Sequence, residues 1–280
     1  LRVFYCTRKK LKDGTFVSFP SFFDLSIKDE KFDLLDVFPS EILPLGEKGT
    51  FDEFGINPIS VVSSENKLKM YYAGWTRCES VHFDASIGYA ISNDNGKTFI
   101  KQFNGPIIGK NKYDKFLIGS PKIKFINQTY YLTYVSGKQW LKTKERYEPV
   151  YKLKIATSKN GIDFKICENT IIKDIIKNEC QASGDIINFK DKYIMLFSFR
   201  DIKNYKNSKS GYKINYAISN DLISWERSNH EVLFCGESFD FDQYSQSYLA
   251  SFNINKKTFV LYQGDELGKY GLGIGEVEFC

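Results

Sequence analysis

The sequence is poor in metal-binding residues. It has only two histidines, and its six cysteines show neither a CxxC pair nor the spacing of a zinc site. Histidine or cysteine clusters are what zinc sites need, so we expect neither a metal nor a cofactor. Cysteines scattered through a chain of 280 residues are typical of reduced thiols in a cytoplasmic protein.

Long apolar runs and a strong net charge are also missing. No stretch of about 18 apolar residues occurs, so no membrane span is expected. The opening "LRVFYCTRKK" lacks the apolar segment of a signal peptide, and its Leu1 in place of Met indicates a piece of a longer chain. The net charge of +5 is compatible with an anionic ligand but gives no reason to expect nucleic acid as a partner.

Aromatic residues are abundant at 16%, which favours strands, and the strands recur. Three segments match one another: "IGYAISNDNGKTFIK" (87–101), "LKIATSKNGIDFKIC" (153–167) and "INYAISNDLISWER" (214–227). In each, an alternating strand, a Ser/Asn/Asp/Gly turn and an aromatic strand predict a hairpin. A further hairpin precedes each segment, at 58–75, 121–137 and 184–201, and a fourth copy follows at 248–266.

The repeat predicts the fold class. Aligning the first strands makes Asn57, Ser120, Ser183 and Ser247 equivalent, at steps of 63, 63 and 64 residues. Four-stranded antiparallel units repeated around an axis are propeller blades, so we expect an all-β five-bladed propeller. A β-sandwich is the competing fold, but it does not explain so regular a repeat. The predicted single domain, 1–280, has its blades at approximately 1–46, 57–108, 120–170, 183–234 and 247–280.

Antiparallel order places the heads of the first strands and the ends of the second strands on one face, which also carries the long loops. Acids precede the first strands, and we take Asp52, Glu179 and Asp242 as candidate catalytic residues. Arginine offers a forked, permanently charged donor for carboxylate or phosphate, and tryptophan can stack on a sugar ring. The candidate binding residues on this face are Arg8, Arg77, Arg200, Trp75, Trp140, Asn57, Ser120 and Asp201.

Two alternatives, in which these side chains have a purely structural role, remain open. Each arginine can pair with a neighbouring acid and hold a loop, and each acid can cap a loop or pair with an arginine. "SNDNGKTF" (92–99) matches the Asp box of sialidase-like propellers. It falls on the opposite face, so we interpret it as a structural hairpin turn.

The sequence resembles the five-bladed β-propeller carbohydrate enzymes, the superfamily of glycoside hydrolase families 32, 43, 62 and 130. It most resembles family-43-like proteins of bacterial polysaccharide loci. The resemblance rests on "FDEFGINPISVV", "KMYYAGW", "SIGYAISNDNGKTF", "GSPKIKF", "YYLTYVSG" and "INYAISNDLISWER", within about residues 50 to 266. It implies a carbohydrate substrate and carboxylates at the strand heads, where this chain has Asn57 and Ser120 instead. Neutral heads cannot act as the carboxylate pair that glycosidases use.

The first hypothesis is therefore an enzyme that cleaves or transfers a glycosyl group of an anionic sugar. It would be a glycosidase, a phosphorylase or a glycosyltransferase. The resemblance alone implies a role in surface polysaccharide metabolism. The second hypothesis is a sugar-nucleotide-dependent glycosyltransferase on the same scaffold, with the arginines on the diphosphate. The third is a non-catalytic glycan-binding propeller that has lost its catalytic ring.

Overall fold

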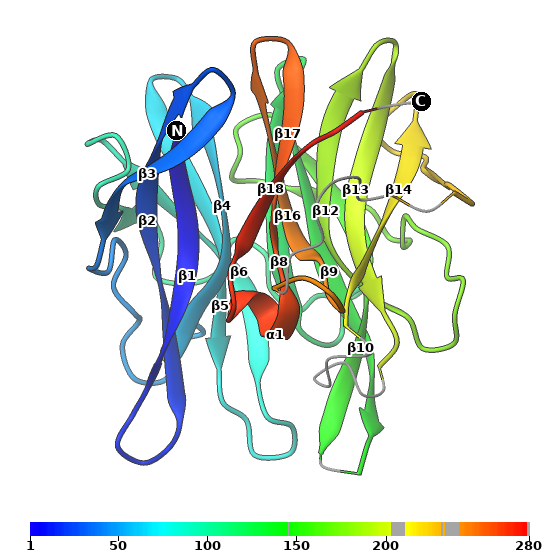
Figure 1. Ribbon diagram of the computed structural model, residues 1–280. Helices are drawn as coiled ribbons and strands as arrows, with labels where there is room; N and C mark the ends of the chain where they lie inside the picture. The colour runs from blue at the N-terminus through cyan, green and yellow to red at the C-terminus, as the bar shows by residue number, and fades with distance from the viewer. Residues whose placement is uncertain (145, 203–210, 231, 233–240, 279–280) are drawn as a thin grey trace. The chain divides into compact units, whose positions relative to one another are not determined.

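The computed structural model describes residues 1–144, 146–202, 211–230, 232 and 241–278 (Figure 1). Strands make up nearly all the regular structure of these residues, and the one helix among them, α1 (Asp265–Gly268), has four residues. None of the helices in the described ranges is long and apolar enough to cross a membrane. The aromatic and β-branched composition accounts for this bias toward strands.

The first sheet has seven strands in the order β1-β2-β4-β5-β6-β7, with β3 paired to β2. A single parallel pair, Ser18 with Gly55, joins β2 to β4, so the sheet has a three-stranded and a four-stranded part. Its strands are β1 (Arg2–Lys10), β2 (Phe16–Lys28), β3 (Lys31–Phe38), β4 (Gly55–Ser64), β5 (Lys67–Thr76), β6 (Asp84–Ser92) and β7 (Ile100–Lys101).

Three smaller sheets follow along the chain. They contain four, four and three strands, in the orders β11-β10-β9-β8, β12-β13-β14-β15 and β16-β17-β18. Their strands are β8 (Ile118–Ile126), β9 (Thr129–Lys142), β10 (Tyr147–Ser158), β11 (Lys165–Ile166), β12 (Cys180–Phe189), β13 (Lys192–Arg200), β14 (Lys213–Ser219), β15 (Glu226–Arg227), β16 (Ser247–Ile254), β17 (Lys257–Gln263) and β18 (Leu272–Glu276).

The Asp-box segment forms a hairpin turn that its own side chains hold together. Asp94 accepts hydrogen bonds from the backbone N–H and the hydroxyl of Thr98, at 3.0 and 2.6 Å, and from Ser92 Oγ at 2.7 Å. These bonds, the Thr98 hydroxyl first, lower the pKa of Asp94 to about 2. Ser158 with Asn160 and Ser219 with Asp221 repeat the arrangement. The carboxylate is fully used within the turn, in keeping with the structural role predicted for it.

The heads of the first strands share an irregular backbone. The strand register shifts between Ile56 and Ile59 in β4, between Ala182 and Asp185 in β12, and between Ser247 and Ala250 in β16. Ser120, Ser183 and Tyr248 have φ angles of 48°, 55° and 53° at these heads. The Asn57–Pro58 peptide bond is cis. Bulges of this kind redirect side chains at the end of a strand.

The described chain divides into two compact units: unit 1 is residues 1–132 with 157–165, and unit 2 is residues 133–156 with 166–280. Each unit has its own apolar core. The core of unit 1 includes Phe22, Leu43, Ile56, Met70, Tyr72 and Phe99. The core of unit 2 includes Ile187, Leu196, Ile214, Leu249, Val260 and Tyr262. The assignment of 1–280 to a single domain, with its blade boundaries, stays a prediction.

Candidate functional site

A row of four residues crosses one end of the first sheet in unit 1. Arg8 on β1 pairs with Ser18 on β2, and Ser18 pairs with Gly55 on β4. Gly55 in turn pairs with Trp75 on β5. Figure 1 shows these strands in blue to cyan. Because directly opposed residues of a sheet point to the same face, the row aligns the side chains of Arg8, Ser18 and Trp75.

A glycine in the middle of the row lets the indole ring of Trp75 lie across the sheet. The Nε1–H of Trp75 donates a 2.8 Å hydrogen bond to Ser18 Oγ, reaching over Gly55. A Cβ atom on Gly55 would lie 1.9 Å from this Nε1 and 2.4 Å from Ser18 Oγ. No side chain larger than hydrogen fits there unless the ring moves. Glycine at this position is therefore required by the neighbouring indole.

Arg77 extends the same region on the other side of Trp75. Its guanidinium carbon lies 4.0 Å above the ring of Phe54, and Phe54 stacks on Trp75 with 6.3 Å between ring centroids. The Nη2 of Arg77 also donates to the backbone oxygen of Phe16 at 3.3 Å. A cation over an aromatic face is attracted by the ring quadrupole. These contacts fix Arg77 next to the indole.

We call Arg8, Ser18, Phe54, Trp75 and Arg77 the Trp75 surface. Arg8 is exposed, and Trp75 and Arg77 are half-buried. Within the residues that the structure describes, neither arginine forms an ion pair. Arg77 is close enough to Asp13 for its charge to contribute to the lowered pKa of that carboxyl, after the hydrogen bonds from Thr15. The surface offers a half-exposed indole flanked by two guanidinium groups.

The predicted strand-head residues provide uncharged groups. Asn57 lies on β4 two residues after Gly55 and is half-buried, whereas Ser120 on β8 is buried. The hydroxyl of Ser120 and that of Ser247 have no hydrogen-bond partner within the described chain. Ser183 Oγ donates to the backbone oxygen of Leu249 at 3.2 Å. None of these heads supplies a carboxylate.

Asp52 is held inside unit 1 by three side chains. It is 2% exposed, and its Oδ2 lies 2.6 Å from Lys101 Nζ and 3.0 Å from the hydroxyl of Tyr72. Thr50 Oγ1 donates to Oδ1 at 3.0 Å. Burial, followed by the charge of Asp52 and this hydrogen bond, raises the pKa of Tyr72. The carboxylate thus fastens the segment before β4 onto β5 and β7.

Asp242 repeats part of this arrangement in unit 2. The hydroxyl of Tyr262 on β17 donates to Asp242 Oδ2 at 2.7 Å, and the Phe241 ring stacks on the Tyr262 ring. Phe51 stacks on Tyr72 in the same way beside Asp52. A glycine faces each tyrosine across the sheet. The partners are Gly88 for Tyr72 and Gly273 for Tyr262. Asp242 is half-buried, and within the described residues it has no cationic partner.

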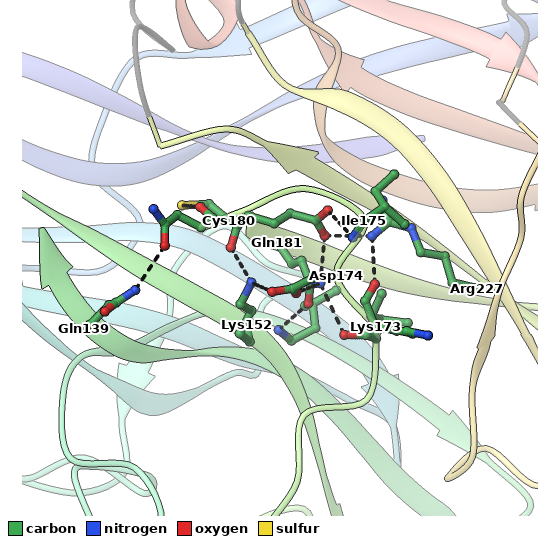
Figure 2. Close-up of polar contacts among 12 residues, drawn as sticks. Gln139, Lys152, Lys173, Asp174, Ile175, Cys180, Gln181 and Arg227 are labelled. Carbon is green, nitrogen blue, oxygen red and sulfur yellow. Dashed lines mark hydrogen bonds and ion pairs between the residues drawn. The ribbon is translucent and has the colours of Figure 1, made fainter.

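Glu179 forms a buried ion pair with Arg227, which is labelled in Figure 2. Its Oε1 is 2.7 Å from Arg227 Nη1, with exposed side-chain fractions of 0% for Glu179 and 4% for Arg227. The Gln181 amide donates to the same oxygen at 2.8 Å, and the Ile175 N–H donates to Oε2 at 3.2 Å. Arg227 also donates to the backbone oxygen of Lys173 at 2.9 Å. The pair therefore ties the segment before β12 to β15.

Arg200 has a different environment from the other two predicted arginines. It lies at the end of β13 in unit 2 and is 4% exposed. Its Nη2 donates to the Tyr151 hydroxyl at 2.9 Å, and its Nη1 donates to the backbone oxygen of Asp201 at 3.0 Å. Its guanidinium carbon lies 5.5 Å from the ring centroid of Tyr151 and 5.1 Å from that of Tyr212. This cation is surrounded by tyrosines, whereas Arg8 faces water.

The structure thus brings together only some of the predicted site residues. Arg8, Trp75 and Arg77 meet on the Trp75 surface, with Asn57 following on β4. Arg200 and Asp201 are neighbours in unit 2, and Trp140 lies half-buried on β9 of the same unit. The roles assigned to these residues, and the catalytic roles of the three acids, stay predictions.

Sequence reasoning missed the partners of these residues. Lys101, Arg227, Tyr72 and Tyr262 hold the acids, and Ser18 and Gly55 place the indole. One signal was present. The dipeptide Phe-Asp stands five residues before the strand head in both "FDEFGIN" and "FDQYSQS", at 51–57 and 241–247. A shared dipeptide at this spacing indicates a structural repeat.

No protein-family model matches the chain. Two uncharacterized proteins of Mycobacterium tuberculosis, from strains CDC 1551 / Oshkosh and ATCC 25618 / H37Rv, are each 25% identical to it over 248 residues. In both cases the match covers 88% of this chain and 79% of the relative.

Several solved structures share the fold. One described as a glycoside hydrolase has a TM-score of 0.70 at 14% identity, covering 100% of this chain and 88% of its own. An endo-arabinase from Bacteroides thetaiotaomicron has a TM-score of 0.64 at 12% identity, covering 100% and 95%. A thermostable family-43 glycoside hydrolase has a TM-score of 0.62 at 14% identity, covering 99% and 91%.

The similarity to these structures shows the fold. The expected fold class, an all-β five-bladed propeller with four-stranded antiparallel blades, is confirmed. The resemblance to the propeller glycoside hydrolases that the sequence motifs indicated is confirmed at the level of structure.

Proposed function

We propose that this protein is a carbohydrate-active enzyme that cleaves or transfers a glycosyl group carrying an anionic substituent. The observation that carries the proposal is the Trp75 surface on a propeller fold. Its indole offers a flat apolar face to a sugar ring, and its two guanidinium groups offer donors to a carboxylate or phosphate. The solved structures with this fold include glycoside hydrolases, which supports the carbohydrate class.

The anionic substituent follows from the charges of the surface. Arg8 and Arg77 lie in the same region as the indole, and within the described chain neither of them forms an ion pair. A sugar acid, a glycosyl phosphate or the diphosphate of a sugar nucleotide can each take up this positive charge. The same proposal includes a role in surface polysaccharide metabolism and a cytoplasmic location. Free thiols suit a reducing compartment, and four of them are described: Cys6, Cys78, Cys167 and Cys180. Cys235 and Cys280 lie outside the described residues.

The first test is a thermal-shift screen of the purified protein. The panel contains neutral sugars, uronic and nonulosonic acids, inorganic phosphate, and CMP-, UDP- and GDP-sugars. A ligand that binds only the folded state raises the melting temperature with its concentration. A shift with one nucleotide family indicates a glycosyltransferase, and a shift with free sugar acids indicates a hydrolase or a glycan-binding protein. No shift with any anion would contradict the proposal.

Arg8→Gln is expected to weaken binding of the anionic ligand by about tenfold or more. A hydrogen bond to a charged group contributes about 1.5–3 kcal/mol, and tenfold in affinity corresponds to about 1.4 kcal/mol. The measurement is the dissociation constant from titration of the ligand that the screen identifies. Lys9→Gln is the matched control, because Lys9 is the next residue of β1 and points to the opposite face. Equal dissociation constants for both variants would remove Arg8 from the site.

A glycan-binding protein without catalysis is the second candidate, and the acids favour it. Asp52 and Glu179 are held in buried ion pairs, and the strand heads are neutral. Two carboxylates facing the scissile bond are the usual requirement of glycoside cleavage. Of the three predicted acids, only Asp242 lacks a cationic partner in the described chain, so Asp242 is the acid to test first.

Asp242→Asn separates the two candidates. For an enzyme that uses Asp242 as acid or base, we expect turnover of the identified substrate to fall by about 100-fold or more. The ligand-dependent rise in melting temperature should persist, because the amide is nearly the same size as the carboxyl group. Activity is measured as glycosyl transfer or release of reducing sugar. Unchanged turnover would exclude Asp242, and binding without turnover in the wild-type protein would establish the glycan-binding alternative.

A further inference from the structure

Unit 2 contains a cavity of about 340 Å³ between the start of β14, the segment after β15 and the segment before β16. Phe199 and Ile175 provide apolar walls. Its main polar lining residues are Lys213, Asn215, Asn229, Gln243, Tyr244 and Gln246. Cavities that bind small molecules have volumes of about 300–1,000 Å³, so this one suits a ligand of monosaccharide size.

Several polar groups in this cavity still have bonding capacity. Asn215 is 5% exposed, and its Oδ1 accepts a 2.6 Å hydrogen bond from the Tyr216 N–H. In the described chain its amide nitrogen has no acceptor. The Gln246 amide nitrogen donates to the Asp242 backbone oxygen, and no described residue donates to its Oε1. A ligand with both hydroxyl donors and acceptors can form hydrogen bonds to these groups.

Among the described residues that line the cavity, the one charged side chain is a cation. Lys213 is exposed at its rim and forms no ion pair with any described residue. No carboxylate is found among the described residues that line the cavity. Tyr244, which also lines the cavity, is 42% exposed and offers an aromatic ring. One cation, several amides and an exposed ring together match a hydroxylated ring that carries one negative charge.

We propose that this cavity is a second binding site, for a sugar acid of the uronic or nonulosonic class. Lys213 pairs with the carboxylate, the amides of Asn215 and Gln246 bind ring hydroxyls, and Tyr244 covers one face of the ring. The site lies wholly within unit 2 and uses no residue of the Trp75 surface. This inference rests on the proposed function in one respect, namely that the small anion bound in the cavity is a sugar acid.

The test measures binding of D-glucuronate, N-acetylneuraminate and neutral D-glucose to the full chain by titration calorimetry and saturation-transfer NMR. Lys213→Gln is the first variant, and because Lys213 is exposed, the substitution removes no buried contact. Lys192→Gln is the matched control, because Lys192 is an exposed lysine at the far end of β13, in the same sheet. We expect Lys213→Gln to weaken binding of a sugar acid by about tenfold, and Lys192→Gln to leave it unchanged.

Arg8→Gln distinguishes this site from the Trp75 surface. Weaker binding in Lys213→Gln that adds to the effect of Arg8→Gln supports two separate sites. Loss of all sugar-acid binding in Arg8→Gln, with no effect of Lys213→Gln, overturns the second site and leaves the proposed function intact. Loss of sugar-acid binding in Lys213→Gln alone supports the second site and contradicts binding at the Trp75 surface. Equal binding of D-glucose and D-glucuronate, or no binding of either acid by the wild-type protein, overturns the inference.

Discussion

Arg227→Met is expected to destabilise the protein by about 3–5 kcal/mol, because it leaves the buried carboxylate of Glu179 without its cation. A loss of this size lowers the melting temperature of a chain this long by on the order of 10 °C. Phe197 and Phe199 lie below the guanidinium, at 5.0 and 4.6 Å from its carbon. The methionine keeps contact with these rings, so the loss reports on charge rather than on packing. Urea unfolding followed by tryptophan fluorescence gives the free energy.

Two controls show whether the buried position causes this effect. The double variant Glu179→Gln with Arg227→Met removes both charges and should recover most of the lost stability, as neutral replacements of buried pairs often do. Lys257→Met breaks an ion pair to Glu276 at 3.1 Å whose side chains are 41% and 33% exposed. We expect it to cost at most about 1 kcal/mol. Equal losses for Arg227→Met and Lys257→Met would show that the Glu179 pair is not effectively buried.

Gly55→Ala is expected to destabilise unit 1 by about 1–3 kcal/mol and to abolish binding at the Trp75 surface. Its new methyl group would overlap the indole nitrogen at 1.9 Å, so the ring must leave its hydrogen bond to Ser18. Displacing the indole removes the flat face proposed for the sugar. The melting temperature and the ligand titration are measured on the same preparation, so that lost binding can be compared with lost stability.

Gly275→Ala is the matched control for this substitution. Gly275 lies on β18, and no atom lies within 4 Å of the Cβ that alanine would add. Since alanine loses less backbone entropy on folding than glycine, this variant should be neutral or slightly stabilising. Combining Gly55→Ala with Trp75→Ala should relieve most of the overlap. A Gly55→Ala protein with unchanged stability and unchanged binding would contradict the geometry of the row.

The fold could be predicted from the sequence because its signals are local. Each hairpin has a two-residue period and a turn of defined chemistry, and the Ser92–Asp94 turn recurs twice in recognisable form. Those features depend on residues a few positions apart. Repeated at steps of about 63 residues, they predict blades, and a repeat of blades predicts a propeller.

The partners within the site could not be predicted, because they depend on register across several strands. Lys101 reaches Asp52 from β7, and Arg227 reaches Glu179 from β15, each 48 or 49 positions along the chain. A shift of one residue in the register of any intervening strand would turn these cations to the other face of the sheet. The sequence shows which acids precede the strands. It does not show which of them are already paired with a cation.

A single parallel pair, Ser18 with Gly55, joins the two parts of the first sheet. Ligand binding at the Trp75 surface is therefore coupled to the association of β1 and β2 with β4. Arg8 belongs to the three-stranded part of the first sheet, and Trp75 belongs to the four-stranded part. A molecule bound to both would link the two parts of that sheet beside the single backbone pair, the indole hydrogen bond to Ser18 and the hydrogen bond from Arg77 to the Phe16 backbone oxygen. Its binding energy would then oppose the peeling of β1 and β2 from β4. The amide hydrogens of these strands would exchange more slowly in the occupied protein.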